Sequence, residues 1–294
     1  MITIAICNHK GGVGKTTTAF NLASKLAYEG AVVVLVDLDP QSNLTQAAGI
    51  AEEDARQGDV YKALQGKFVG MNGKAKLQTL GKRMLLNNEE TNQETGELHI
   101  APSTLDLSAA EMELLGEPGR EFLLKNLIEP YFTVYNDQFI HGTKDGKEPR
   151  PFYCIIDCPP SLGLLTINAL VAADYLLIPM QAEQFAVHGL TKVIEIANKV
   201  RERLNSTLKK PLILFTQYDK RKVLHRDIAG TLRSNVETAT ILSNEIRNNI
   251  ALAEAAANGK NIFEYEPGSN GAVDYAAVVE ELTNHFEKQK KQPF

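Results

Sequence analysis

A glycine-rich stretch close to the N-terminus carries the residues whose types and spacing most clearly predict chemistry. Positions 8–17 read Asn-His-Lys-Gly-Gly-Val-Gly-Lys-Thr-Thr, between an apolar run and a helical pattern. Glycines let backbone N–H groups close around phosphate oxygens, and the start of a helix adds a partial positive charge. A lysine at this place neutralises the β- and γ-phosphates, and the hydroxyl that follows it ligates Mg²⁺. The stretch therefore predicts a nucleotide-binding site built from Gly11, Gly12, Val13, Gly14, Lys15, Thr16 and Thr17, with Thr16 as a metal ligand.

The stretch departs from the usual phosphate-loop pattern G-x-x-x-x-G-K-[ST], because His9 stands where that pattern has its first glycine. An additional lysine, Lys10, precedes the Gly-Gly pair. This is the deviant Walker A pattern K-G-G-x-G-K-[ST]-[ST], and through it the chain resembles the ParA/MinD group of ATPases. The resemblance implies that Lys10 crosses a dimer interface to the partner's ATP, where it stabilises transition-state charge as an arginine finger does. An exposed loop lysine without this task is the alternative.

Acidic residues follow two further apolar runs. Asp37 and Asp39 come at the end of one, and Asp157 ends another. Carboxylates at the carboxyl ends of parallel strands lie at one edge of the sheet, beside the phosphate loop. The resemblance implies that 36–41 form switch I, with Asp39 positioning the hydrolytic water, whereas the role of Asp37 stays open. It also implies that Asp157 holds Mg²⁺ through water and that 157–163 form switch II.

Shorter motifs extend the resemblance almost to the C-terminus. Residues 178–190 resemble the family's P-x-Q-x-E and A-x-x-G-L elements, and 253–272 resemble its closing segment. Gln217 stands where the family places its base-contacting strand end, so it is expected to face adenine; a surface glutamine is the alternative. The best match is the ParA/Soj-type partition ATPase. A phosphate loop starting near residue 8 predicts the short form, without an N-terminal helix-turn-helix domain.

Apolar runs alternate with helical patterns, and this order predicts the elements that position the site. Strand–helix–strand units build parallel sheets. We therefore expect a single α/β domain over 1–294, a doubly wound, mostly parallel sheet with helices on both faces, as in P-loop NTPases. Polar stretches at about 66–97 and 135–151 are predicted to be loop insertions. The strand candidates are 2–7, 31–36, 98–101, 153–156, 175–179 and 212–216, and the helical candidates include 107–115, 120–128, 187–204, 223–235 and 272–288.

Composition excludes several classes of protein. The 294 residues are 44% hydrophobic and 23% charged, which is typical of a globular chain, and the net charge of −5 shows no global basicity. No apolar run approaches the ~18 residues of a membrane span, and the first residues lack a signal-peptide core. Cys7, Cys154 and Cys158 show no metal-type or disulfide pairing, so buried thiols in a reducing cytoplasm are expected. An iron–sulfur protein on the same fold would need cluster cysteines.

One window is strongly basic. The window from Lys209 to Arg233 contains seven basic and two acidic residues, so its net charge is +5 and that of the rest of the chain is −10. A local patch of this kind is sufficient to neutralise DNA phosphates, and without interleaved aromatic residues it predicts non-specific binding. A solvated helix face is the alternative. The candidate DNA-binding residues are Lys220, Arg221, Lys222, Arg226 and Arg233, and the resemblance adds Arg247 and Lys260.

The resemblance implies a cytoplasmic, nucleoid-associated ATPase with ATP and Mg²⁺ as cofactors. It implies a homodimer in the ATP state that binds double-stranded DNA. Slow hydrolysis would be stimulated by a ParB-like or other cargo adaptor, and the cargo (plasmid, chromosome or protein assembly) stays open. The alternative is a MinD-like membrane-associated positioning ATPase. The tail carries Lys288, Lys290 and Lys291, but its apolar residues have the spacing of a core-packed helix, so no membrane partner is expected.

Overall fold

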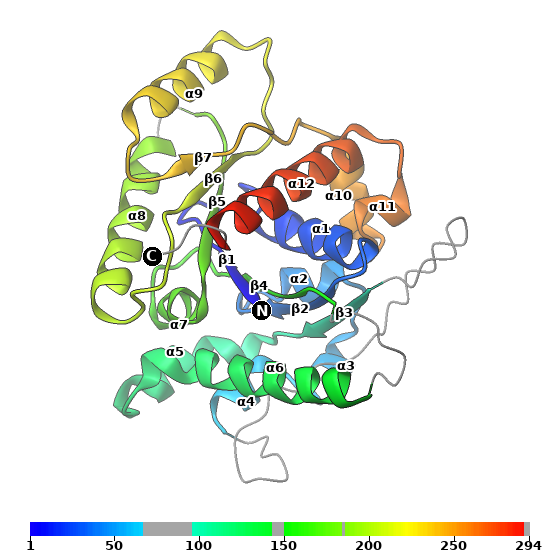
Figure 1. Cartoon of the computed structure of the whole chain (residues 1–294), viewed down its shortest axis with the longest axis vertical. Helices are drawn as coiled ribbons and strands as arrows, with labels where there is room; N and C mark the ends of the chain where they lie inside the picture. The colour runs from blue at the N-terminus through cyan, green and yellow to red at the C-terminus, as the bar shows by residue number, and fades with distance from the viewer. Residues whose placement is uncertain (67–95, 143–149, 184–185, 291–294) are drawn as a thin grey trace.

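A seven-stranded parallel sheet forms the centre of the molecule (Figure 1). The computed structural model describes residues 1–66, 96–142, 150–183 and 186–290, and across them the strand order is β3-β2-β4-β1-β5-β6-β7. Every pairing is parallel, so the predicted fold class is confirmed and the sheet is more uniform than expected. The strands are β1 (Ile2–Ile6), β2 (Val32–Asp37), β3 (Glu97–Ala101), β4 (Phe152–Asp157), β5 (Tyr175–Met180), β6 (Leu212–Phe215) and β7 (Thr240–Ile241).

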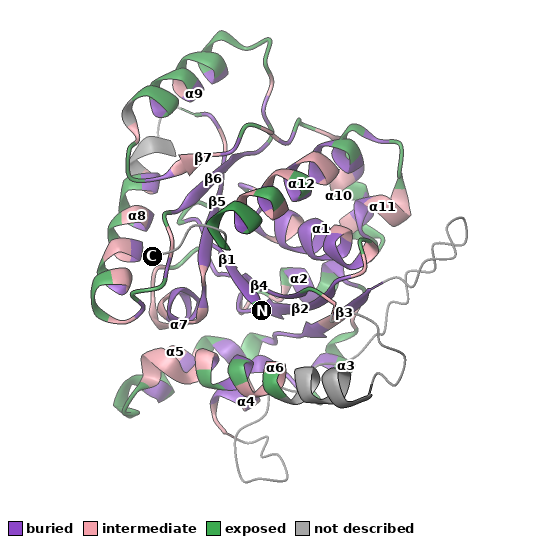
Figure 2. Ribbon diagram, viewed as in Figure 1, coloured by how far each residue is buried: buried purple, intermediate pink, exposed green. Residues whose placement is uncertain are grey.

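Helices cover both faces of the sheet, and each face has its own apolar core. Successive residues of one strand point to opposite faces. Thus Val33 and Leu35 of β2 join one core, whereas Val32 and Val34 join the other. Figure 2 shows the central strands coloured as buried, with exposed residues on the outward-facing parts of the helices. One core packs α1 (Lys15–Tyr28), α2 (Asn43–Ala47), α10 (Ile250–Ala257), α11 (Ile262–Tyr265) and α12 (Asn270–Lys290); the other packs α4 (Val60–Leu64), α5 (Ala110–Glu113), α6 (Leu123–Gly142), α7 (Leu164–Ala172), α8 (Ala186–Arg203) and α9 (Val223–Asn235).

Two predicted segments differ from the structure. The helix expected over 107–115 is a short α5 between two 3₁₀ turns, η1 (Leu105–Ala109) and η2 (Leu114–Gly116); η3 (Arg120–Phe122) precedes α6. The insertion expected at 135–151 begins too early, because α6 continues to Gly142. Phe132 packs edge-to-face on Phe152 of β4 and anchors the helix beyond its predicted end. Residues 143–149, and 67–95 of the other predicted insertion, lie outside the described residues.

The strand order brings the carboxyl ends of β2, β4 and β1 together. Asp157 at the end of β4 lies in register with Asp37 of β2 on one side and with Ile6 of β1 on the other. The glycine-rich loop follows Ile6 directly. The sheet therefore places the acidic residues of two strands beside that loop, as the sequence predicts.

Candidate active site

The loop between β1 and α1 has the open backbone that an oxyanion site requires. Gly12 and Gly14 have φ of +72° and +84°, in the left-handed region that glycine adopts without strain. The Thr216 hydroxyl after β6 donates to the carbonyl of Val13 at 2.8 Å and holds the loop against the sheet. A Cβ built on Gly11 or Gly12 would meet no atom of the described residues within 4 Å, chain neighbours aside, so there is free space at this part of the loop. This space fits a phosphate group approaching the backbone.

Lys15, Thr16 and Asp157 meet at the start of α1. The Thr16 Oγ1 donates to Asp157 Oδ2 at 2.7 Å, and the buried Lys15 donates through Nζ to the carbonyl of Lys10 at 3.3 Å. The other carboxylate oxygen, Asp157 Oδ1, is buried without a hydrogen-bond partner among the described residues. Burial, and next to it the neighbouring Asp37, raises the pKa of Asp157 well above its usual range. A hydroxyl and an unsatisfied buried carboxylate oxygen are the hard oxygen ligands that Mg²⁺ prefers.

Asp37 fixes the turn that carries Asp39. Asp37 is fully buried; its Oδ2 accepts hydrogen bonds from the Thr45 backbone N–H at 2.9 Å and the Thr45 hydroxyl at 2.7 Å. Its Oδ1 accepts the backbone N–H of Asp39 at 3.0 Å. Burial raises the pKa of Asp37 to about 6, although these hydrogen bonds oppose the shift. Asp37 thus has a positioning role that the sequence left open, and Asp39 in turn accepts the Gln41 N–H.

Lys10 contacts the segment that follows β5. Its Nζ lies 2.5 Å from Glu183 Oε2 and 3.3 Å from Gln181 Oε1, and the side chains of Lys10 and Glu183 are about half exposed. The Lys10 backbone N–H donates to Asn8 Oδ1 at 3.0 Å, which ties the loop start to the end of β1. The ammonium group is therefore paired at the surface within its own subunit.

Gln217 lies at the phosphate loop. It has φ of +51°, and its Nε2 donates to the carbonyl of Gly12 at 3.1 Å. Gln181 donates to the same carbonyl at 3.3 Å. Two side chains from the ends of β5 and β6 thus share one loop carbonyl, and the predicted contact of Gln217 with adenine stays a prediction.

The predicted DNA-binding cations fall into one cluster and two outliers. A bridge between Tyr218 and Arg247 brings Arg247 beside the turn from β6 to α9, where Lys220, Arg221 and Lys222 lie. Arg226, in the first turn of α9, donates to the Lys220 carbonyl at 2.8 Å. Arg233 is farther along α9, with its guanidinium 5.9 Å from the Phe215 ring centre, and Lys260 is exposed after α10. Several cations are already paired: Lys220 with Glu245, Arg221 with Asp219, and Arg247 with Asp274, at 2.5, 3.0 and 2.6 Å.

Two contacts at the site could not be found from sequence. Thr45 follows switch I and carries no motif, yet its hydroxyl satisfies Asp37 and accepts the Ser103 N–H at 2.9 Å. The P-x-Q-x-E motif includes Glu183 and could have indicated that this residue belongs to the site. Nothing in the motif indicated that Glu183 pairs with Lys10.

Comparison with known proteins gives consistent matches. The chain matches the AAA domain family over residues 1–142 and 149–210. It is 37% identical over 279 residues to the chromosome partitioning protein ParA of Myxococcus xanthus, covering 95% of this chain and 87% of that protein. It is also 37% identical over 279 residues to the sporulation initiation inhibitor protein Soj of Bacillus subtilis, with 95% and 97% covered.

Solved structures share the fold along nearly the whole chain. Cobyrinic acid a,c-diamide synthase from Mycobacterium smegmatis, with bound ADP and magnesium, superposes with a TM-score of 0.73 at 28% identity, covering 100% of this chain and 98% of that one. McdA from Cyanothece, in complex with ATP, gives 0.73 at 23% identity, covering 97% and 96%, and this likeness shows the fold alone.

The parallel sheet, the glycine-rich loop at the end of β1 and the Thr16–Asp157 pair define a P-loop ATPase. The two bacterial relatives identify the family within this class, because each matches almost the whole chain at more than 30% identity. The chain belongs to the ParA/Soj family of partition ATPases.

Proposed function

We propose that this chain is a Mg²⁺-dependent ATPase that forms an ATP-sandwich homodimer, binds double-stranded DNA non-specifically and partitions or positions a cargo. The observation that carries the proposal is the Thr16–Asp157 hydrogen bond, with Asp157 Oδ1 unsatisfied by any residue that the structure describes, beside an open phosphate loop. The Myxococcus xanthus relative, which is named for chromosome partitioning, supports the partition role. The solved relative with bound ADP and magnesium supports the cofactors.

In the proposed hydrolysis, the site residues bind the phosphates, hold the metal or orient the attacking water. Backbone N–H groups of 11–17 and the Lys15 ammonium would bind the phosphates, and Thr16 and Asp157 would hold the metal, Asp157 through water. Magnesium bound there would supply charge neutralisation on the phosphate oxygens. Asp39 would orient the attacking water from a turn that Asp37 fixes by a 3.0 Å hydrogen bond.

Lys10 would act in the partner subunit. Lys15 already occupies the position that serves the phosphates of its own subunit, so a second lysine on the same loop has a separate task. The Lys10 side chain is about half exposed, which leaves it accessible to a second copy of the chain. In an ATP-sandwich dimer it would stabilise transition-state charge on the partner's nucleotide, and hydrolysis would remove the contact that joins the subunits.

The turn from β6 to α9 is the proposed DNA-binding surface. The side chain of Lys220 is 75% exposed, although its partner Glu245 is 8% exposed. Arg221 is 91% exposed, and an ion pair this open to solvent contributes little, so DNA phosphates can replace its partner Asp219. Arg247 differs, because its guanidinium makes several hydrogen bonds to the largely buried Asp274. Replacing Arg247 would therefore disturb packing as well as charge. Lys222 is exposed at the N-cap of α9 and gives the cleaner test.

A membrane-associated role receives less support. Most large apolar side chains of α12 lie in the core, where Tyr275, Val278, Leu282 and Phe286 are almost fully buried, so they are not presented to lipid. Among the residues that the structure describes, no helix combines the length and apolarity needed to cross a bilayer.

The test is binding to random-sequence duplex DNA, measured by fluorescence anisotropy with ATP, ADP or no nucleotide. Wild type should bind only with ATP, and Asp39→Ala should retain this binding while losing hydrolysis. Lys222→Glu should weaken binding and lower its salt dependence, whereas Lys192→Glu, an exposed lysine on α8, should change neither. Equal binding in all nucleotide states, or none in any, would refute the DNA role, and liposome binding would then test the membrane alternative.

A further inference from the structure

An exposed apolar surface lies on the short elements between β3 and α6. We call residues 105–117, which comprise η1, α5, η2 and Glu117, the α5 ridge. Leu105, Met112 and Leu115 are 65%, 77% and 58% exposed, whereas Leu107 and Leu114 of the same segment are buried in the core. The ridge is thus anchored by one set of apolar side chains and presents a second set to solvent. Clustered exposed apolar side chains on a folded protein indicate an interaction surface.

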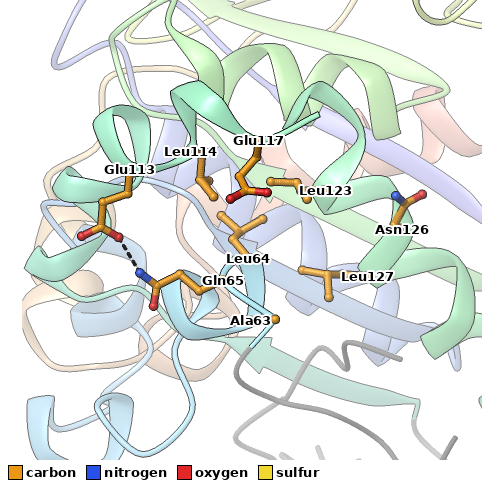
Figure 3. A pocket seen from close by; sticks show the side chains of 10 residues that line it. Ala63, Leu64, Gln65, Glu113, Leu114, Glu117, Leu123, Asn126 and Leu127 are labelled. Atoms are coloured by element: carbon orange, nitrogen blue, oxygen red, sulfur yellow. Dashed lines mark hydrogen bonds between the residues drawn. The ribbon is translucent and has the colours of Figure 1, made fainter. Parts of the chain in front are cut away.

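The same surface is strongly acidic. Between Ser103 and Gly119 the chain has four carboxylates and no lysine, arginine or histidine, which gives this stretch a charge of −4. The ridge borders a cavity of about 570 Å³, whose lining includes Glu113 and Glu117 beside Leu64, Leu123 and Leu127 (Figure 3). An apolar surface with this charge is complementary to a basic amphipathic segment. A second copy of the chain would bring the same acidic ridge, and symmetric apposition of the two would be repulsive.

The ridge is connected to both proposed switch segments. Just before it, the Ser103 N–H donates to Thr45 Oγ1 at 2.9 Å, and Thr45 holds Asp37. Within it, Glu111 Oε1 accepts the N–H of Leu165, in the first turn of α7, at 3.4 Å. Glu111 also lies so close to Gly163 that a Cβ there would come within 2.2 Å of Oε1. A ligand that shifts the ridge would therefore act on the segments carrying Asp39 and Asp157.

We propose that the α5 ridge is the docking surface for a basic amphipathic peptide segment of the cargo adaptor, and that docking stimulates hydrolysis through Thr45 and Glu111. This inference rests on the proposed function for its link to hydrolysis. Its binding step is independent of that link. The apolar face of the peptide would cover Leu105, Met112 and Leu115, and its cations would pair with the surrounding carboxylates.

The experiment uses a labelled synthetic Leu/Lys peptide of about five helical turns (~18 residues) with one apolar face, and the same composition scrambled to remove that face. Binding to the full chain is measured by fluorescence anisotropy, and ATP turnover is measured with and without peptide. The ridge variants are Met112→Ser and Glu117→Lys. Their matched controls are Val273→Ser, a 56% exposed apolar residue of α12, and Glu280→Lys, an exposed acid of the same helix.

Wild type should bind the amphipathic peptide and not the scrambled one, and each ridge variant should bind about tenfold more weakly than its control. Bound peptide should raise turnover in wild type and less so in the ridge variants. Equal affinity in ridge and control variants, or no binding by wild type, overturns the proposal. A loss of ATP-dependent dimerisation in Met112→Ser would assign the ridge to the subunit interface and also overturn it. Wild type that binds peptide but hydrolyses no ATP would refute the proposed function and leave the docking surface standing.

Discussion

Lys10 and Glu183 join the phosphate loop to the segment after β5 through a 2.5 Å ion pair within one subunit. In the isolated subunit, the lysine that is proposed to contact the partner's nucleotide is therefore paired with a carboxylate of its own chain. Forming the dimer contact requires that this pair be broken. Because both side chains are about half exposed, breaking the pair costs little free energy, and this cost weakens dimerisation directly.

Replacing Glu183 with Gln should make ATP-dependent dimerisation easier. The substitution removes the charge that holds Lys10 in both subunits, and each exposed ion pair contributes about 0.2–1 kcal/mol, so the dimer dissociation constant should fall by about two- to thirtyfold. Sedimentation velocity with a non-hydrolysable ATP analogue measures this constant. Glu195→Gln, which removes an exposed acid from α8, is the control and should leave it unchanged. A dissociation constant that rises in Glu183→Gln would show that Glu183 supports the dimer instead.

Replacing Lys10 with Ala should separate ATP binding from stimulated turnover. In the proposed function, Lys15 and the loop N–H groups bind the phosphates of the same subunit, so affinity for a fluorescent ATP analogue should stay within about twofold of wild type. Adaptor-stimulated hydrolysis should be abolished, because the transition-state charge in the partner loses its cation. Stimulated turnover that is undiminished would contradict the role assigned to Lys10.

Removing the Thr45 hydroxyl should destabilise the protein from a position outside any motif. Thr45→Val keeps the backbone donor to Asp37 but removes the hydroxyl donor, and it deprives the buried Ser103 N–H of its acceptor. Unsatisfied buried groups cost about 1–3 kcal/mol, so the free energy of unfolding in urea should fall by that amount. Thr238→Val at an exposed loop position should change it by less than about 0.5 kcal/mol. Equal losses in the two variants would refute this explanation.

Asp37 should make the nucleotide-free protein less stable as pH rises. Its pKa is about 6 in the folded state, above the ordinary carboxyl value of the unfolded chain, so the folded state binds more protons between these values. Its stabilising contribution is complete below about pH 4 and is lost as pH rises through 6. Two pKa units correspond to about 3 kcal/mol.

The measurement is urea unfolding of wild type and Asp37→Asn, without nucleotide or magnesium, from about pH 4.5 to 7.5. Wild type should lose about 2 kcal/mol relative to the variant across this range, since the variant has no carboxyl to ionise there. A difference between the two proteins that stays constant with pH would show that Asp37 titrates at its ordinary value.

The sequence predicted what depends on local pattern and missed what depends on distant contacts. The long strands were predicted because each is a short apolar run buried on both faces, and the phosphate loop because its glycines set their own backbone conformation. The end of α6 was missed because it depends on Phe132 packing against Phe152. The contacts of Thr45 with Ser103 and of Lys10 with Glu183 join residues 58 and 173 positions apart, and no local signal could pair them.

Asp157 should lower the stability of the ligand-free protein and be required for the binding of Mg²⁺ with ATP. It is fully buried, its pKa is raised by burial, and Oδ1 has no partner among the described residues, so the charged form of this carboxyl is unfavourable without a bound cation. Asp157→Asn removes that charge and keeps an oxygen to accept the Thr16 hydroxyl. The Tm of the variant without ligand should therefore rise by a few degrees.

Mg²⁺ with ATP should raise the Tm of wild type, because a ligand that binds only the folded state stabilises it, and this shift should vanish in the variant. Asp174→Asn, which replaces a carboxylate at the start of β5 that accepts the Thr3 N–H, is the control and should keep the ligand shift. If Asp157→Asn retains the full shift, the metal is held without this carboxylate, and the role of the Thr16–Asp157 pair would have to be reassigned from metal binding to packing.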